Sequence, residues 1–146
     1  MPHTDIGQRL KTLREKCGKS AKAIADLVEI PVGSYYDLED GNDWFQGIEL
    51  IKICSLALLL GVTTPELLVG RPHDGVNSIT LDELKQKLVE WLEYSNIDLS
   101  VFEKRIGWEV ESFLKDSATA REWNIDCLKA VCQAIGVDWT DVSFCK

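Results

Sequence analysis

The chain has 146 residues, which is enough for one or two small domains and too few for a large barrel or a doubly wound fold. Hydrophobic residues make up 45% and charged residues 27%, an ordinary composition for a folded domain, while the net charge of −8 repels phosphate backbones. The longest apolar stretch, residues 53–62, is too short to cross a bilayer and the first residues contain no apolar signal-peptide segment, so we expect a cytoplasmic protein with no membrane contact.

Apolar residues recur at helical spacing almost throughout the chain, and no segment alternates as a strand does, so the sequence predicts an all-α protein. In the first half we expect five helices, over residues 5–17, 20–28, 31–40, 48–60 and 64–70. Ser20 is a typical N-cap, Pro31 and Pro65 suit a first helical turn, and glycines close most of these helices.

Residues 71–79 concentrate turn-forming residues and have no apolar periodicity, which predicts a linker between two domains, 1–70 and 80–146. The second domain opens on a capping box from Thr80 to Glu83. Further apolar spacing predicts helices over residues 80–95, 98–106, 109–115 and 123–135, followed by a last short turn over 139–144. The order of elements therefore repeats the order in the first domain.

An internal alignment makes the repeat concrete. When the chain is aligned with itself at an offset of 78 residues, apolar residues match apolar residues: Leu10 with Leu88, Ile24 with Phe102, and Tyr35 with Phe113. After a shorter loop in the second half the offset becomes 75, which matches Leu50 with Ile125, Ile53 with Leu128, and Leu67 with Val142. Because the matched residues are mainly apolar, the repeat indicates a shared core plan rather than a shared activity.

The first domain carries an ordered set of short motifs over residues 5–70. They are Ile6-Gly7-x-Arg9-Leu10-Lys11-x-Leu13-Arg14, Gly18-x-Ser20, Ile24-Ala25, Leu38-Glu39-x-Gly41 and Ala57-x-x-Leu60-Gly61-Val62-x-x-x-Glu66-Leu67-Leu68. This set resembles the phage repressor and Cro family of helix-turn-helix DNA-binding proteins, and residues 81–144 resemble it more weakly, as a diverged copy. The resemblance implies two tandem five-helix lambda-repressor-like units, in which the third helix of the first unit enters the major groove.

The resemblance also implies roles for individual residues. Arg14 and Glu39 match family positions that form a structural ion pair. For a DNA-binding transcriptional regulator with double-stranded DNA as its partner, we expect one set of residues on the phosphates and another against the groove. The phosphate set is Lys19, Ser20 and Lys22, and the groove set is Val32, Gly33 and Tyr36. Apolar side chains of the groove set can meet thymine methyl groups.

Other features of the same segment favour an alternative, a protein-interaction or DNA-mimic module that keeps the fold without specific DNA binding. Neither valine nor glycine makes a bidentate hydrogen bond to a base, Ala21 opens the second helix, and Asp37 repels phosphate. Residues 5–22 hold six Lys and Arg against two acidic residues, a net +4, whereas residues 23–70 hold one Lys against eight, a net −7. The first helix can therefore contact phosphates while the third helix remains acidic.

The fourth helix carries three apolar residues that its counterpart in the second domain lacks. Ile51, Cys54 and Leu58 follow one side of the helix, where the second domain has Asp126, Lys129 and Gln133. This extra apolar face predicts an interface, with the second domain, with a second copy in a homodimer, or with a regulatory protein.

Sequence motifs for catalysis or cofactor binding are not found. The chain has no phosphate-cradling glycine loop, no H-E-x-x-H and no G-x-S-x-G, and its two histidines, His3 and His73, stand in segments without ligand spacing. We therefore expect no enzyme activity, no cofactor and no metal site.

Overall fold

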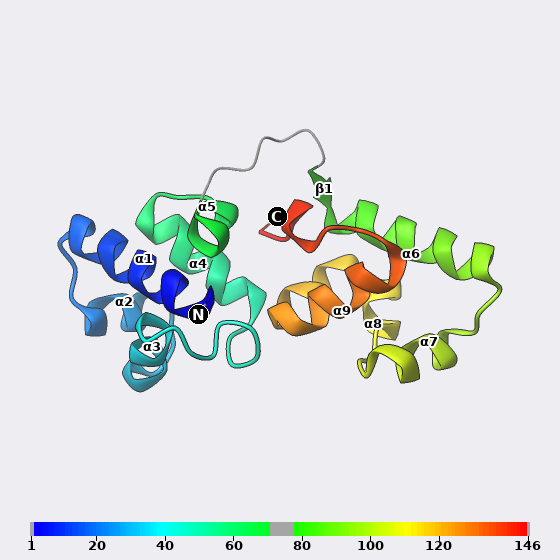
Figure 1. Ribbon diagram of the computed structural model, residues 1–146, viewed down its shortest axis with the longest axis horizontal. Coiled ribbons are helices and arrows are strands. Elements are labelled where there is room, and N and C mark those ends of the chain that lie inside the picture. Colours follow the sequence, from blue (N-terminus) through cyan, green and yellow to red (C-terminus); the bar gives the residue numbers. More distant parts are fainter. Residues whose placement is uncertain (1, 71–77, 146) are drawn as a thin grey trace. The chain divides into compact units, whose positions relative to one another are not determined.

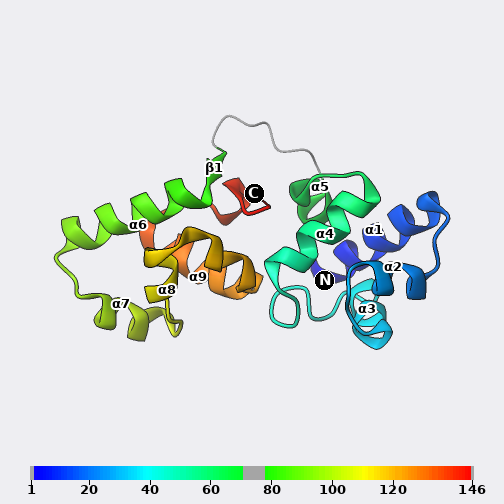
Figure 2. The same ribbon diagram turned by 180° about the vertical axis from the view of Figure 1, so that it is seen from behind.

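A computed structural model describes residues 2–70 and 78–145, and the chain divides into two compact units, Met1–His73 and Asp74–Lys146. Nearly all regular structure is helical, so the predicted all-α class is confirmed (Figures 1 and 2). The first unit holds α1 (Pro2–Cys17), α2 (Ala21–Leu27), α3 (Val32–Glu39), α4 (Leu50–Leu60) and α5 (Thr64–Val69). Residues 71–77 of the predicted linker lie outside the described residues.

Local capping explains where these helices begin and end. The Ser20 Oγ accepts a hydrogen bond from the Ala23 N–H at 3.1 Å and so caps α2. Thr63 and Glu66 form a complete capping box at the start of α5. Some helix starts differ from expectation: α1 begins at Pro2 and α4 at Leu50. Pro31 is the N-cap of α3, with extended backbone, and not its first helical residue. Proline suits this place, because its fixed φ matches the N-cap backbone and its missing N–H costs the helix no hydrogen bond.

The core of the first unit forms where α1 crosses α3, α4 and α5, and α2 packs on α3. Fully buried side chains from every helix meet in it, among them Leu10, Ile24, Tyr35, Leu38, Leu50, Ile53 and Leu67. Gly7 marks the closest approach, because a Cβ built on it would lie 2.4 Å from the carbonyl oxygen of Glu39 and 2.7 Å from the nitrogen of Gly41. The absence of a side chain at Gly7 therefore sets how closely α1 approaches the end of α3.

The second unit holds β1 (Ile79–Thr80), α6 (Leu81–Ser95), α7 (Leu99–Ile106), α8 (Glu111–Lys115), a 3-10 helix η1 (Ser117–Glu122), α9 (Ile125–Ile135), a 3-10 turn η2 (Trp139–Asp141) and β2 (Val142–Ser143). The predicted capping box of Thr80 and Glu83 is present at the start of α6. The two short strands pair in parallel, with Ile79 opposite Val142. Ile79, the last residue of the predicted linker, thus pairs with a residue 63 positions further along the chain, and a partner so distant leaves no local pattern in the sequence.

Residues matched by the internal repeat are buried to the same degree in the two units. Leu10 and Leu88 are both fully buried, as are Tyr35 and Phe113, and α4 and α9 are each 11 residues long. The α3 counterpart is shorter, since α8 has 5 residues against 8 in α3. The matched positions thus share burial, while the helix that would read DNA differs in length.

We predict that Gly7→Ala destabilises the first unit by about 1–3 kcal/mol, because the added methyl group has backbone atoms and not a flexible side chain in its way. Gly33→Ala is the matched control, since a Cβ at Gly33 meets nothing within 4 Å, and alanine in a helix is expected to be neutral or up to about 1 kcal/mol stabilising. Urea unfolding of both variants measures the difference. Equal stability of the two would contradict the close α1–α3 contact.

Candidate nucleic-acid interface

Helices α2 and α3 are joined by residues 28–31, a connection as short as that of a helix-turn-helix. Glu29 takes a left-handed backbone conformation in this connection, with φ of 60°, and the Ile30 N–H bonds the Ala25 carbonyl at 3.0 Å. Tyr35 and Leu38 anchor the inner side of α3, with exposed fractions of 0% and 1%. The connection therefore turns the chain sharply enough for α3 to pack on α2 while its other side stays open to solvent.

The outer side of α3 carries the residues expected against the groove. Val32 is 37% exposed and Tyr36 is 54% exposed, and Gly33 lies between them on the surface. Asp37 and Asp40 are also exposed, and neither forms an ion pair with any residue that the structure describes. Because α3 contains no Lys or Arg, this surface combines apolar and acidic groups.

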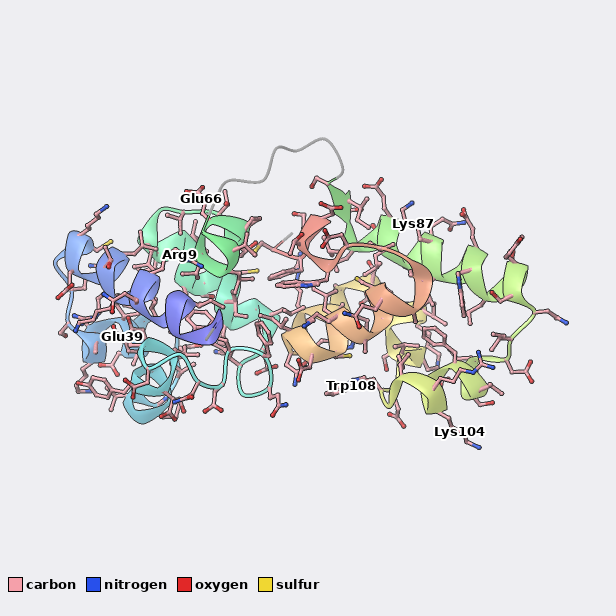
Figure 3. The ribbon with its side chains drawn as sticks, viewed as in Figure 1. Arg9, Glu39, Glu66, Lys87, Lys104 and Trp108 are labelled. Carbon is pink, nitrogen blue, oxygen red and sulfur yellow. The ribbon has the colours of Figure 1, made fainter. Side chains whose placement is uncertain are left out.

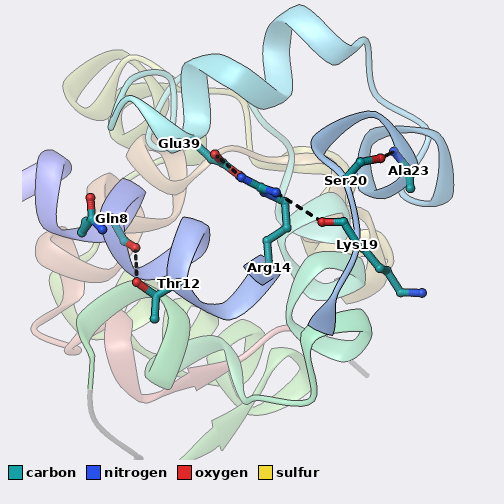
Figure 4. A network of polar contacts seen from close by, with 7 residues as sticks. All are labelled: Gln8, Thr12, Arg14, Lys19, Ser20, Ala23 and Glu39. Atoms are coloured by element: carbon teal, nitrogen blue, oxygen red, sulfur yellow. Dashed lines mark hydrogen bonds and ion pairs between the residues drawn. The ribbon is translucent and has the colours of Figure 1, made fainter. Parts of the chain in front are cut away.

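Arg14 joins three parts of the first unit (Figure 4). Its Nε and Nη2 donate to the two carboxylate oxygens of Glu39 at 2.5 and 3.3 Å, and its Nη1 donates to the Lys19 carbonyl at 3.2 Å. The side chains of Arg14 and Glu39 are only 17% and 9% exposed. The Glu39 carboxylate accordingly raises the pKa of the Arg14 guanidinium. One cation thus ties α1 to the end of α3 and to the segment before α2.

Tyr35 lies beside this ion pair. Burial, with a contribution from the Glu39 carboxylate, raises the pKa of its phenol, which therefore stays protonated at neutral pH. Its hydroxyl oxygen is buried without a hydrogen-bond partner among the described residues. The aromatic ring of Tyr35 is fully buried in the core of the first unit.

The three residues expected on the phosphates have different surroundings. Lys19 is exposed and its ammonium group forms no ion pair with the described part of the chain. The hydroxyl of Ser20 is engaged in capping α2. Lys22 pairs with Asp26 at 3.2 Å across one helical turn, with both side chains largely exposed. Lys19 is therefore the more available of the two cations.

Two of the six cations in residues 5–22, Arg9 and Arg14, form hydrogen bonds that stabilise the first unit. Arg9 extends from α1 to α5, where its Nε donates to the Leu67 carbonyl at 2.9 Å and its Nη2 to the Leu68 carbonyl at 3.2 Å (Figure 3). These carbonyls end α5 and lack partners within the helix. With Arg9 and Arg14 engaged in this way, Lys11 and Lys16 remain exposed without an ion pair to a described residue.

Sequence reasoning missed the role of Trp44, in the loop between α3 and α4. Trp44 is fully buried, and its Nε1 donates to the Leu38 carbonyl at the end of α3, at 2.8 Å. The loop is thus fastened to α3 by an aromatic side chain. A single tryptophan in a polar loop is the signal that could have indicated this anchor.

The three residues of the predicted interface lie on α4. Leu58 is 83% exposed and Ile51 is 43% exposed, while Cys54 is partly buried. Their neighbours Leu50, Ile53 and Leu56 are fully buried and form the inner side of the helix. Ile51 and Leu58 therefore lie outside the core of the first unit.

The described residues contain no cluster of three or more potential metal ligands, and none of their helices is long and apolar enough to span a membrane. Cys127 and Cys132 are buried in α9, and burial raises the pKa of both thiols to about 12, so both are protonated at neutral pH. A comparison with protein-family models, curated proteins and solved structures finds no match to this chain.

We predict that Arg14→Ala destabilises the first unit by about 1.5–3 kcal/mol, because the Glu39 carboxylate loses two charge-assisted hydrogen bonds in a largely buried place. Lys22→Ala is the control, since its exposed pair with Asp26 is expected to contribute about 0.5 kcal/mol or less. Chemical denaturation followed by circular dichroism gives both values. A loss of stability for Lys22→Ala as large as for Arg14→Ala would disprove the special role of Arg14.

Proposed function

We propose that this chain is a DNA-binding transcriptional regulator, not an enzyme, and that its first unit binds double-stranded DNA through α2 and α3. The observation that carries the proposal is the short α2–α3 connection, which leaves Val32, Gly33 and Tyr36 exposed at the start of α3. In helix-turn-helix proteins the first residues of the second helix contact base edges in the major groove. The position of these three residues on α3 supports the same use here.

Affinity for DNA comes mainly from cations on phosphates, whatever the sequence of the DNA. Lys11, Lys16 and Lys19 are exposed lysines of the first unit that form no ion pair with described residues, and Lys19 lies directly before α2. Arg14 donates hydrogen bonds both to the Lys19 carbonyl and to the Glu39 carboxylate (Figure 4). It therefore holds the backbone of Lys19 in a fixed position relative to α3. The phosphate contacts position the duplex, and Val32 and Tyr36 then meet the groove.

Sequence preference is expected to be modest. The apolar side chains Val32 and Tyr36 can contact thymine methyl groups but offer no bidentate hydrogen bonds. Asp37 and Asp40 repel nearby phosphates, which limits how closely the end of α3 approaches the duplex. A regulator of this kind gains specificity by combining weak contacts from two copies on one DNA.

A second candidate function is favoured by the same two carboxylates. A helix-turn-helix whose outer helix has exposed Asp37 and Asp40 and no Lys or Arg also suits a protein-interaction or DNA-mimic module. The two candidates differ in their dependence on salt, because only DNA binding releases counterions from phosphates in proportion to the lysines involved.

We expect Lys19→Ala to weaken binding to mixed genomic fragments for every DNA sequence and to reduce the slope of log K against log salt by about 0.9. Lys22→Ala is expected to change both quantities less, because Asp26 already neutralises Lys22. Tyr36→Ala is expected to alter the preference among sequences with a smaller loss of affinity. The measurement is fluorescence anisotropy at several salt concentrations.

Lys87 is an exposed lysine of α6 in the second unit (Figure 3). Its variant Lys87→Glu is the control and should leave the binding of DNA to the first unit unchanged. The absence of any DNA binding at low salt by the unmodified chain would reject the regulator proposal and leave the protein-interaction candidate. Unchanged binding by Lys19→Ala would show that another surface faces the duplex.

A further inference from the structure

The second unit exposes a small surface that combines apolar and basic side chains, which we call the α7 surface: Val101, Lys104, Arg105 and Trp108. Val101 and Trp108 are 42% and 37% exposed. Val101 precedes the two cations by three and four residues, so they share one side of α7, and Trp108 follows directly after the Gly107 cap. Lys104 and Trp108 lie along the same edge of the second unit in Figure 3.

The two cations of the α7 surface are available for a partner. Neither Lys104 nor Arg105 forms an ion pair with a described residue. The nearest acidic neighbour in sequence, Glu103, instead accepts the backbone N–H of Val110 at 2.7 Å. Exposed tryptophan and arginine are the residue types that contribute most to binding at protein interfaces.

The outer side of α3 has the complementary composition, and we call it the α3 surface: Val32, Tyr36, Asp37 and Asp40. Val32 and Tyr36 lie one helical turn apart, and Asp37 and Asp40 border them with carboxylates that have no cation among the described residues. Each surface thus offers two exposed apolar residues beside two unpaired charges, and the charges are of opposite sign.

We propose that the α3 surface of one copy of the chain docks on the α7 surface of a second copy. Asp37 and Asp40 face Lys104 and Arg105, and Val32 and Tyr36 contact Val101 and Trp108. Two such contacts, related by a twofold axis, close a homodimer. The exposed pairs contribute little affinity by themselves, so the apolar contacts supply most of it and the charges select the partner surface.

A protein surface suits the α7 surface better than a nucleic acid does. Glu109 and Glu111 follow Trp108 and are both exposed, and Glu111 pairs with Lys115 at 3.2 Å, so the two cations are not part of the continuous basic patch that binds phosphate backbones. The proposal does not depend on DNA binding. If DNA also uses the α3 surface, the homodimer and the DNA complex exclude each other, and a rising protein concentration opposes binding to DNA.

The test is a charge exchange followed by sedimentation velocity at low salt. One variant carries Lys104→Glu and Arg105→Glu, and the other carries Asp37→Lys and Asp40→Lys. Each variant alone is expected to self-associate at least about tenfold more weakly than the unmodified chain, because like charges then face each other in both contacts. An equimolar mixture of the two is expected to recover association, since every contact in the mixed dimer again joins opposite charges.

Tyr94→Ala serves as the control for an exposed residue outside both surfaces, with an exposed fraction of 92%, and should associate as the unmodified chain does, whereas Leu58→Asp tests the competing interface on α4. Circular dichroism checks that every variant is folded. A chain that is monomeric at all concentrations, or a mixture that fails to recover association, would overturn the proposal. Dissociation by Leu58→Asp with none in the charge variants would overturn it too, and would assign the interface to α4.

Discussion

The position of α3 in the first unit depends on one contact, the packing of α1 against it. Gly7 lets the backbone of α1 approach the Glu39 carbonyl, and Arg14, two turns further along α1, holds the Glu39 carboxylate with two hydrogen bonds. The same guanidinium bonds the Lys19 carbonyl before α2. Arg14 therefore fixes both α2 and α3 relative to α1, so a change in this contact moves the whole candidate interface.

This arrangement separates what holds α3 from what α3 presents. On its inner side, Tyr35 and Leu38 are buried in the core and Glu39 pairs with Arg14. The residues on its outer side are exposed and are not part of the core. The outer side can therefore carry Val32, Tyr36, Asp37 and Asp40 without loss of stability. The fold alone does not determine what the outer side of α3 binds, and function has to be argued from the exposed residues themselves.

Much of the fold could be predicted from local sequence. Helix ends follow from capping residues such as Ser20, Thr63 and Thr80, whose partners lie three residues away. The linker boundary at Ile79 could not be predicted, because the residue pairs with Val142 far along the chain. The same holds for Arg9, whose acceptors lie on α5, and for Trp44, whose acceptor depends on how the loop returns to α3. By contrast, the pair of Lys22 and Asp26 has the spacing of one helical turn and was open to prediction.

The central claim, that the first unit meets its partner through the segment before α2 and the outer side of α3, is tested most directly by nuclear magnetic resonance. Amide resonances of the chain are followed while a mixed-sequence DNA duplex is added at low salt. The account predicts that the amides of Lys19, Ser20, Val32, Gly33 and Tyr36 shift together while those around Leu58 and Tyr94 do not. Shifts confined to the second unit, or none at all, would contradict it.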